Sequence, residues 1–191
     1  MQTIFRALSG LAALAVVALA GAAALHQLLV ASNAAKFPPP GAFAEFESRR
    51  LHYVCRGAGA PVVIFESGLG TDSQLSWARI ANELSAHTRA CYYDRAGYGW
   101  SDGAPPPRSI AQIARELGAV IDAAAGDAPV ILVGHSLGGP MIRAYANEHS
   151  DRVAGMVFVD SSHEEQITRL PGAADAPRPP DWRQRYGAWL A

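Results

Sequence analysis

The sequence predicts an α/β fold in which helices cover both faces of a mostly parallel sheet. Two uninterrupted apolar runs, Val62 to Phe65 and Val130 to Val133, are typical of strands that are buried on both faces of such a sheet. Stretches with helical periodicity separate the strands. Strands that alternate with helices of about 10–15 residues indicate parallel crossover units, so the fold class follows from the order of these patterns.

The N-terminal segment, residues 1–36, is predicted to be an apolar helix. No charge interrupts the run from Ala7 to Leu25, whose length is close to the roughly 20 residues that span a bilayer. Two interpretations remain open: a membrane anchor, or a cleaved secretory signal with a small-residue processing site at Ala22 to Ala24. Arg6 before the run favours a cytoplasmic N-terminus, so we expect a membrane-anchored protein with an extracytoplasmic domain, or an exported one.

Residues 37–46 are expected to form a spacer, because their consecutive prolines stiffen the chain. The folded domain is predicted over residues 47–165, and residues 166–191 are expected to begin a cap region. The first predicted strand of the domain, Arg50 to Cys55, alternates in polarity and ends at a glycine-rich turn.

Apolar residues at helical spacing fill the segments between the strands. After the first apolar run, Trp77, Ile80 and Leu84 share one predicted helix face, and Arg89 to Tyr93 is the next strand. Ser109 is a candidate N-cap for the helix that follows a break of three prolines. The remaining predictions are a helix stripe of Ile110, Ile113, Ala114, Leu117 and Ile121, a helix with Met141, Ile142 and Tyr145, and a strand from Val153 to Val159.

The charge balance argues against partners that recognise a strong electrostatic field. The chain has 16 basic and 17 acidic residues, and no basic helix stands out, so nucleic-acid binding is not expected. The 6 histidines are scattered, and neither Cys55 nor Cys91 has the spacing of a zinc ligand. We therefore expect no metal site and no organic cofactor.

The strongest chemical signal is the segment Gly134 to Gly138, which reads Gly-His-Ser-Leu-Gly and matches the G-x-S-x-G nucleophile elbow. It follows the second apolar run and opens a helical segment, which is the context that this motif requires. The glycines leave room for a tight turn that lifts the hydroxyl clear of the sheet, and the helix N-terminus stabilises negative charge. Ser136 is therefore the candidate nucleophile.

A second signal is the glycine-rich loop Glu66 to Gly70, directly after the first apolar run. A tetrahedral intermediate needs two convergent N–H donors for its oxyanion. One donor is expected from Leu137, the residue after the nucleophile, and the other from Leu69 in this loop. The sequence thus predicts an oxyanion hole formed by the N–H groups of Leu69 and Leu137.

A third segment, Asp94 to Ser101, contains two glycines and is interpreted as a tightly wound structural loop. Its Asp94 and Arg95 side chains are expected to bond the backbone and each other. We expect no direct catalytic role for Asp94.

These motifs, together with Val157 to His163, make the chain similar to the α/β-hydrolase superfamily from about residue 47 to residue 165. The resemblance implies a sheet with one antiparallel member among its first strands, and Ser136 as the nucleophile. It does not identify the substrate, because this fold hosts esterases, lipases, peptidases and lyases.

In this family the triad follows the order serine, acid, histidine. The chain ends at Ala191, where a cap would begin, so we expect a truncated form that lacks the triad histidine. Asp160, after the last predicted strand, is the candidate acid, and His163 in the same loop is the alternative considered for the base. The last predicted strand would then lie at an open edge of the sheet.

The resemblance also implies that the strands containing Cys55 and Cys91 are antiparallel neighbours. Opposite residues on such strands lie about 4.5–5.5 Å apart at Cα, within the range of about 4.4–6.8 Å found for disulfides. In an oxidising compartment a bridge can form. The alternative is a pair of buried free thiols.

The function that follows is a serine hydrolase that cleaves a small-molecule ester or amide through an acyl-Ser136 intermediate. Two alternatives remain open. One is lyase or haloperoxidase-type chemistry on the same serine, and the other is an inactive remnant or binding module on the hydrolase scaffold.

Overall fold

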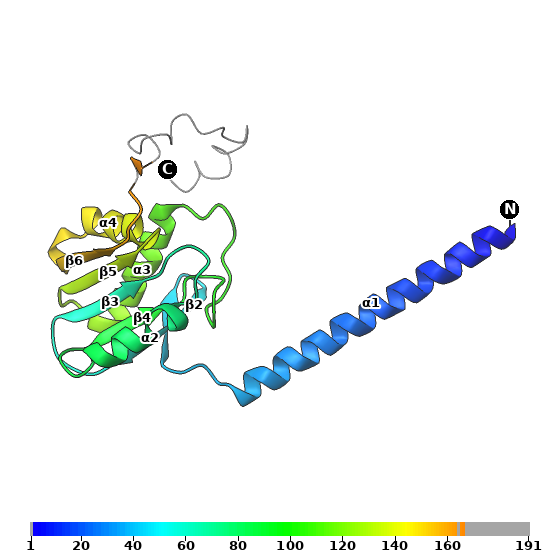
Figure 1. The fold of residues 1–191 in the computed structure, drawn as a ribbon, viewed down its shortest axis with the longest axis horizontal. Helices are drawn as coiled ribbons and strands as arrows, with labels where there is room; N and C mark the ends of the chain where they lie inside the picture. Colours follow the sequence, from blue (N-terminus) through cyan, green and yellow to red (C-terminus); the bar gives the residue numbers. More distant parts are fainter. Residues whose placement is uncertain (1, 164, 167–191) are drawn as a thin grey trace. The chain divides into compact units, whose positions relative to one another are not determined.

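A six-stranded sheet organises the chain after its N-terminal helix. The computed structural model describes residues 2–163, 165 and 166, and its strands follow the order β1-β2-β4-β3-β5-β6 (Figure 1). The pairs β1/β2 and β2/β4 are antiparallel, and the pairs β3/β4, β3/β5 and β5/β6 are parallel. The mostly parallel α/β fold is therefore confirmed. The strands are β1 (Ala42–Phe46), β2 (Arg49–Arg56), β3 (Val62–Glu66), β4 (Ala90–Tyr93), β5 (Val130–His135) and β6 (Val153–Val159).

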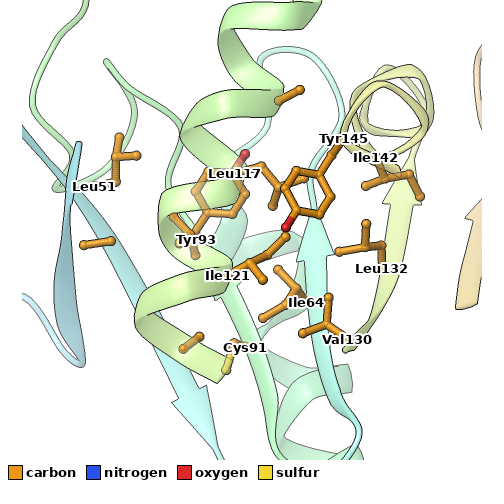
Figure 2. Close-up of a cluster of buried hydrophobic side chains, with 14 of the residues drawn as sticks. Leu51, Ile64, Cys91, Tyr93, Leu117, Ile121, Val130, Leu132, Ile142 and Tyr145 are labelled. Carbon is orange, nitrogen blue, oxygen red and sulfur yellow. The ribbon is translucent and has the colours of Figure 1, made fainter. Parts of the chain in front are cut away.

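Strand β3 shows why a continuous apolar run predicts a sheet that is covered on both faces. All 5 of its residues are buried. Val62 and Ile64 belong to the core cluster that includes residues of α3 (Ile110–Ala125) and α4 (Gly138–Glu148), part of which Figure 2 shows. Val63 and Phe65 belong to a second cluster that includes α2 (Ser73–Leu84). Helices thus cover both faces, as predicted.

Side chains cap the N-termini of α2 and α3. The side chain of Asp72 accepts hydrogen bonds from two N–H groups in the first turn of α2, and Ser109 caps α3, as predicted. The predicted stripe of α3 is buried from Ile113 to Ile121. The three apolar residues predicted for α4, Met141, Ile142 and Tyr145, are also buried.

Two elements differ from the sequence prediction. Residues 42–46, assigned to the spacer, form the edge strand β1, which pairs with β2 through its backbone and buries Ala44 against the core. On α2 the buried residues are Ser73, Trp77 and Ala81, whereas Ile80 is 48% exposed. The buried residues are four positions apart, so the face of α2 that packs on the sheet follows a spacing of four residues rather than three.

A disulfide joins Cys55 in β2 to Cys91 in β4, as the resemblance implied. The two residues face each other in the antiparallel register, and their Cα atoms are 4.0 Å apart. The pair lies beside the larger core cluster, which contains Cys91 (Figure 2). The alternative of two free thiols is therefore excluded.

The N-terminal helix α1 (Gln2–Lys36) belongs to a separate compact unit, which ends at Pro39. Its segment Gly10–Asn33 has 24 residues, a mean hydropathy of 2.1 and no buried residue. Length and composition are sufficient for this helix to cross a membrane, and a secretory signal satisfies the same criteria.

Strand β6 lies at one edge of the sheet, where it pairs with β5. Among the described residues no further strand covers it, in agreement with the expected open edge. Four consecutive apolar side chains there are between 40% and 49% exposed: Met156, Val157, Phe158 and Val159.

Candidate active site

Ser136 occupies the turn between β5 and α4 and has a φ angle of +50°. Residues other than glycine rarely adopt this left-handed conformation, which clusters at functional sites because the surrounding structure must enforce it. The backbone of Ser136 is held on both sides. Its N–H donates to Val159 O at 3.2 Å, and its carbonyl accepts from Gly139 N at 3.1 Å and from Ser162 N at 2.9 Å.

The two glycines of the elbow are required by close backbone contacts. A Cβ atom on Gly134 would lie 2.9 Å from backbone atoms of Gly138 and Gly139. A Cβ atom on Gly138 would lie 2.6 Å from the carbonyl oxygen of Glu66 and 2.9 Å from that of Ser67. The sequence motif therefore corresponds to a real packing constraint between the elbow and the end of β3.

The N-terminus of α4 differs from those of the other two domain helices. Asp72 and Ser109 cap α2 and α3 with their side chains, whereas α4 starts after Leu137 with no side-chain cap among the described residues. The first N–H groups of a helix carry partial positive charge, and an uncapped terminus leaves them available to an anion. Leu137, one of the two predicted oxyanion donors, is the residue at this terminus.

The glycine-rich loop after β3 lies directly against Ser136. A Cβ atom on Gly68 would be 3.2 Å from Cβ of Ser136 and 2.9 Å from Nδ1 of His135. The structure therefore brings together the two segments that the sequence predicts for the oxyanion hole. The His135 ring packs against this loop and edge-on to Trp77, with 6.3 Å between the ring centroids.

A buried ionic cluster supports the same loop. Arg95 Nη1 lies 2.9 Å from Glu66 Oε1, and the hydroxyl of Tyr93 donates a hydrogen bond to the other oxygen of Glu66. Burial is the largest influence on Glu66 and raises its pKa, although Arg95 and Tyr93 act in the opposite direction. Burial and the neighbouring Glu66 raise the pKa of Tyr93 well above its usual value. The sequence analysis did not identify this cluster.

Asp94 forms a second buried cluster instead of bonding Arg95. Its carboxylate lies 2.9 Å from His52 Nδ1 and accepts hydrogen bonds from the Ser73 hydroxyl and the Trp100 N–H. The other ring nitrogen of His52 contacts the carbonyl oxygen of Pro40. Asp94 therefore fastens the loop after β4 to β2 and α2. The expected bonds to the backbone are present, since Asp94 accepts from the Trp100 N–H and Arg95 donates to backbone carbonyls. The expected bond between Asp94 and Arg95 is wrong, because the side-chain partners of Asp94 are His52 and Ser73.

The pKa of Asp94 predicts how stability depends on pH. Burial is the largest single influence and raises it, but the hydrogen bonds from His52, Ser73 and Trp100 together leave the pKa below its usual value. A lowered carboxyl pKa stabilises the fold above the unfolded value of about 3.9, and this contribution is lost as pH falls through the folded pKa.

We therefore expect Asp94→Asn to lower the free energy of unfolding by about 2 kcal/mol near pH 7, because a buried hydrogen bond to a charged group is lost. The difference from the wild type should shrink as the pH is lowered below about 4. Urea unfolding of the wild type and of Asp94→Asn, from pH 3 to pH 7, measures this difference in the free energy of unfolding. A difference that stays constant over this range would contradict the assignment.

Asp160 and His163 lie in the loop after β6, which bonds the backbone of Ser136. Val159 and Ser162, which flank Asp160 and Ser161, both bond the backbone of Ser136. Asp160 has a φ angle of +42°, and its side chain is exposed. His163 lines a cavity of about 380 Å³ together with Arg143, Phe158, Ser161 and Ser162.

The contacts of His163 differ from those of a triad base. Its Nδ1 accepts a hydrogen bond from the N–H of Glu165 at 3.1 Å. A triad histidine donates from Nδ1 to its acid and accepts the serine proton at Nε2. Within the described residues, no group of three or more histidine, cysteine or acidic side chains could hold a metal ion.

The chain is similar to known proteins in sequence and in fold. A family model described as the alpha/beta hydrolase fold matches residues 61–191. RutD of Caulobacter vibrioides, a proposed carbamate hydrolase, is 38% identical over 114 residues, which are 58% of this chain and 42% of that protein. An uncharacterized vacuolar membrane protein of Saccharomyces cerevisiae is 38% identical over 112 residues, 57% of this chain and 17% of that protein.

Solved structures show the same fold. An esterase from Thermogutta terrifontis matches with a TM-score of 0.60 at 22% identity, over 75% of this chain and 49% of the esterase. A hydrolase from Pseudomonas aeruginosa matches with a TM-score of 0.60 at 26% identity, over 77% of this chain and 51% of the hydrolase. The chain thus spans about half the length of these solved hydrolases, and less than half of the two relatives above.

Proposed function

The chain belongs to the alpha/beta hydrolase fold family, and from this premise we propose that it is a serine hydrolase of ester or amide bonds with Ser136 as its nucleophile. The observation that carries the proposal is the left-handed conformation of Ser136 in a turn whose flanking glycines admit no side chain. This conformation exposes the hydroxyl at the start of α4, where developing negative charge is stabilised.

The proposed reaction proceeds through a covalent intermediate. A base removes the hydroxyl proton as Ser136 Oγ attacks the carbonyl carbon, and the oxyanion accepts hydrogen bonds from the N–H groups of Leu69 and Leu137. Collapse of this intermediate expels the alcohol or amine, which takes up the proton, and leaves an acyl-Ser136 ester. Water then attacks the ester with the help of the same base and releases the carboxylic acid.

Asp160 is the proposed acid of the triad, because its loop is bonded to the backbone of Ser136. We propose none of the described histidines as the base, since His163, the histidine of this loop, accepts a hydrogen bond at Nδ1. The substrate is proposed to be a small-molecule ester or amide, a class consistent with the esterase and the carbamate hydrolase among the similar proteins. The mechanism requires no metal or organic cofactor.

We further propose that α1 attaches the protein to a membrane, or directs its export, and that the hydrolase domain lies outside the cytoplasm. The apolar segment Gly10–Asn33 and the vacuolar membrane relative support an association with a membrane. The disulfide between Cys55 and Cys91 supports an oxidising compartment, because such bonds are rare in the cytosol.

Labelling with a fluorophosphonate probe tests the nucleophile, because the probe reacts with activated serines. We expect the probe to label the chain, and Ser136→Ala to reduce the labelling by at least about 100-fold, because this substitution removes the proposed nucleophile.

Ser76→Ala serves as the matched control, because the Ser76 hydroxyl bonds the carbonyl of Asp72, the N-cap residue of its own helix. This variant should be labelled like the wild type. Absence of labelling in the wild type, or unchanged labelling of Ser136→Ala, would refute the proposed function and leave a binding scaffold as the interpretation.

A further inference from the structure

Arg95 holds the backbone of the loop that precedes Leu69. This side chain is only 5% exposed, and its Nη1 donates to the carbonyl oxygen of Ser67 at 2.7 Å. Its Nη2 donates to the carbonyl oxygen of Gly68, the next residue. One guanidinium therefore fixes two consecutive peptide groups, and the planar fork of arginine suits this arrangement.

The contact with Gly68 determines the direction of the Leu69 N–H. In a planar trans peptide group the C=O of one residue and the N–H of the next point in opposite directions. Because Arg95 and the hydroxyl of Thr71, at 3.0 Å, both donate to the Gly68 oxygen, the N–H of Leu69 must point away from Arg95. The peptide group cannot rotate without breaking both hydrogen bonds.

Arg95 is itself held in place by Glu66 and Met141. Glu66 is fully buried and accepts from Nη1 at 2.9 Å, and Tyr93 bonds the other oxygen of this carboxylate. The same Nη1 lies 3.4 Å from Sδ of Met141 in α4. The guanidinium thus connects the loop that carries Leu69 with α4, whose N-cap residue is Leu137.

We propose that Arg95 is a positioning residue of the oxyanion hole, which sets the direction of the Leu69 N–H through the carbonyls of Ser67 and Gly68. The inference rests on the proposed function of Ser136. It assigns a role to Arg95 that is distinct from neutralising the buried charge of Glu66.

Arg108 provides a matched control for that distinction. It also pairs with a fully buried glutamate, because Nη1 and Nη2 each lie 2.6 Å from the carboxylate oxygens of Glu116. Arg95 and Arg108 line the same cavity of about 160 Å³. The hydrogen bonds described for Arg108 reach Glu116, whereas those of Arg95 also reach the loop carbonyls.

The experiment measures inactivation of the full chain by a fluorophosphonate, with the maximal rate constant kinact separated from the binding constant KI. We expect Arg95→Met to lower kinact about 100-fold with KI nearly unchanged, because the phosphoryl oxygen of the probe occupies the oxyanion hole. Arg108→Met should lose thermal stability as well, but keep kinact within about threefold of the wild type.

Arg95→Lys separates charge from geometry and covers the case in which Arg95→Met fails to fold. Lysine keeps a positive charge opposite Glu66, but an ammonium group lacks the planar fork that reaches two carbonyls and a carboxylate. We expect kinact of this variant to fall at least about tenfold, with a smaller loss of thermal stability than in Arg95→Met.

Backbone ¹⁵N relaxation of the full chain in detergent micelles gives a readout that does not depend on reactivity. The order parameters of Gly68 and Leu69 should fall from about 0.85, typical of rigid backbone, to below about 0.6 in Arg95→Met. In Arg108→Met they should remain at the wild-type value.

Each outcome bears on one of the two proposals. Wild-type kinact in a folded Arg95 variant, or an equal loss in Arg108→Met, would overturn the role of Arg95 and leave Ser136 as the nucleophile. If the wild type does not react at all, the proposed function fails. The order parameters of Gly68 and Leu69 then decide alone whether Arg95 holds the loop, and unchanged values overturn the inference.

Discussion

Gly138→Ala is expected to lower the free energy of unfolding by at least about 3 kcal/mol and to abolish labelling of Ser136. The added Cβ would lie 2.6 Å from the carbonyl oxygen of Glu66 and 2.9 Å from that of Ser67. Both atoms belong to the backbone at the end of β3, so a side-chain rotation cannot relieve the overlap. The start of α4 must move away from the sheet, and the elbow moves with it.

Urea unfolding and fluorophosphonate labelling measure the two effects of Gly138→Ala. Gly155→Ala is the control, because no atom lies within 4 Å of the position of its added Cβ. This control should change stability by less than about 0.5 kcal/mol. If Gly138→Ala retained the stability and reactivity of the wild type, the close packing of the elbow on β3 would be wrong.

Removal of the disulfide is expected to lower the free energy of unfolding by roughly 3–4 kcal/mol. The bridge joins residues 36 positions apart, and a closed loop of this length restricts the unfolded chain by about that amount. For a domain of this size the corresponding fall in melting temperature is on the order of 10 °C. The test compares the wild type with the double variant Cys55→Ala/Cys91→Ala in thermal and urea unfolding.

Dithiothreitol provides the control for the cysteine variants. It should lower the stability of the wild type to that of the double variant and leave the double variant unchanged. A stability difference below about 1 kcal/mol, or two titratable thiols in unreduced protein, would contradict the bridge.

The sequence predicted those elements whose pattern reflects burial on both faces. The apolar runs of β3 and β5 mark strands enclosed between helices, and the stripe of α3 marks a helix with one contact face. Strand β1 was missed because an edge strand of 5 residues shows little periodicity and follows directly on prolines. Ile80 was misplaced because a step of three and a step of four are equally compatible with a helix.

The elbow could be predicted because its residues are contiguous and its glycines follow from local sterics. The cluster of Glu66, Tyr93 and Arg95 could not, because its members come from two strands and the pairing of these strands is a tertiary property. A sequence signal for this cluster was nevertheless present. Charged residues directly follow two apolar strands. Because the ends of neighbouring parallel strands meet at one edge of the sheet, these charged residues are expected to lie close together.

The ring of His52 lies between two oxygen atoms from distant parts of the domain. One nitrogen faces the carbonyl oxygen of Pro40 and the other faces the carboxylate of Asp94, and both of these groups are acceptors. The ring therefore bridges two segments that are far apart in the sequence. The segment that enters the domain at Pro40 is therefore tied to the loop after β4 by one aromatic ring placed between two oxygen atoms.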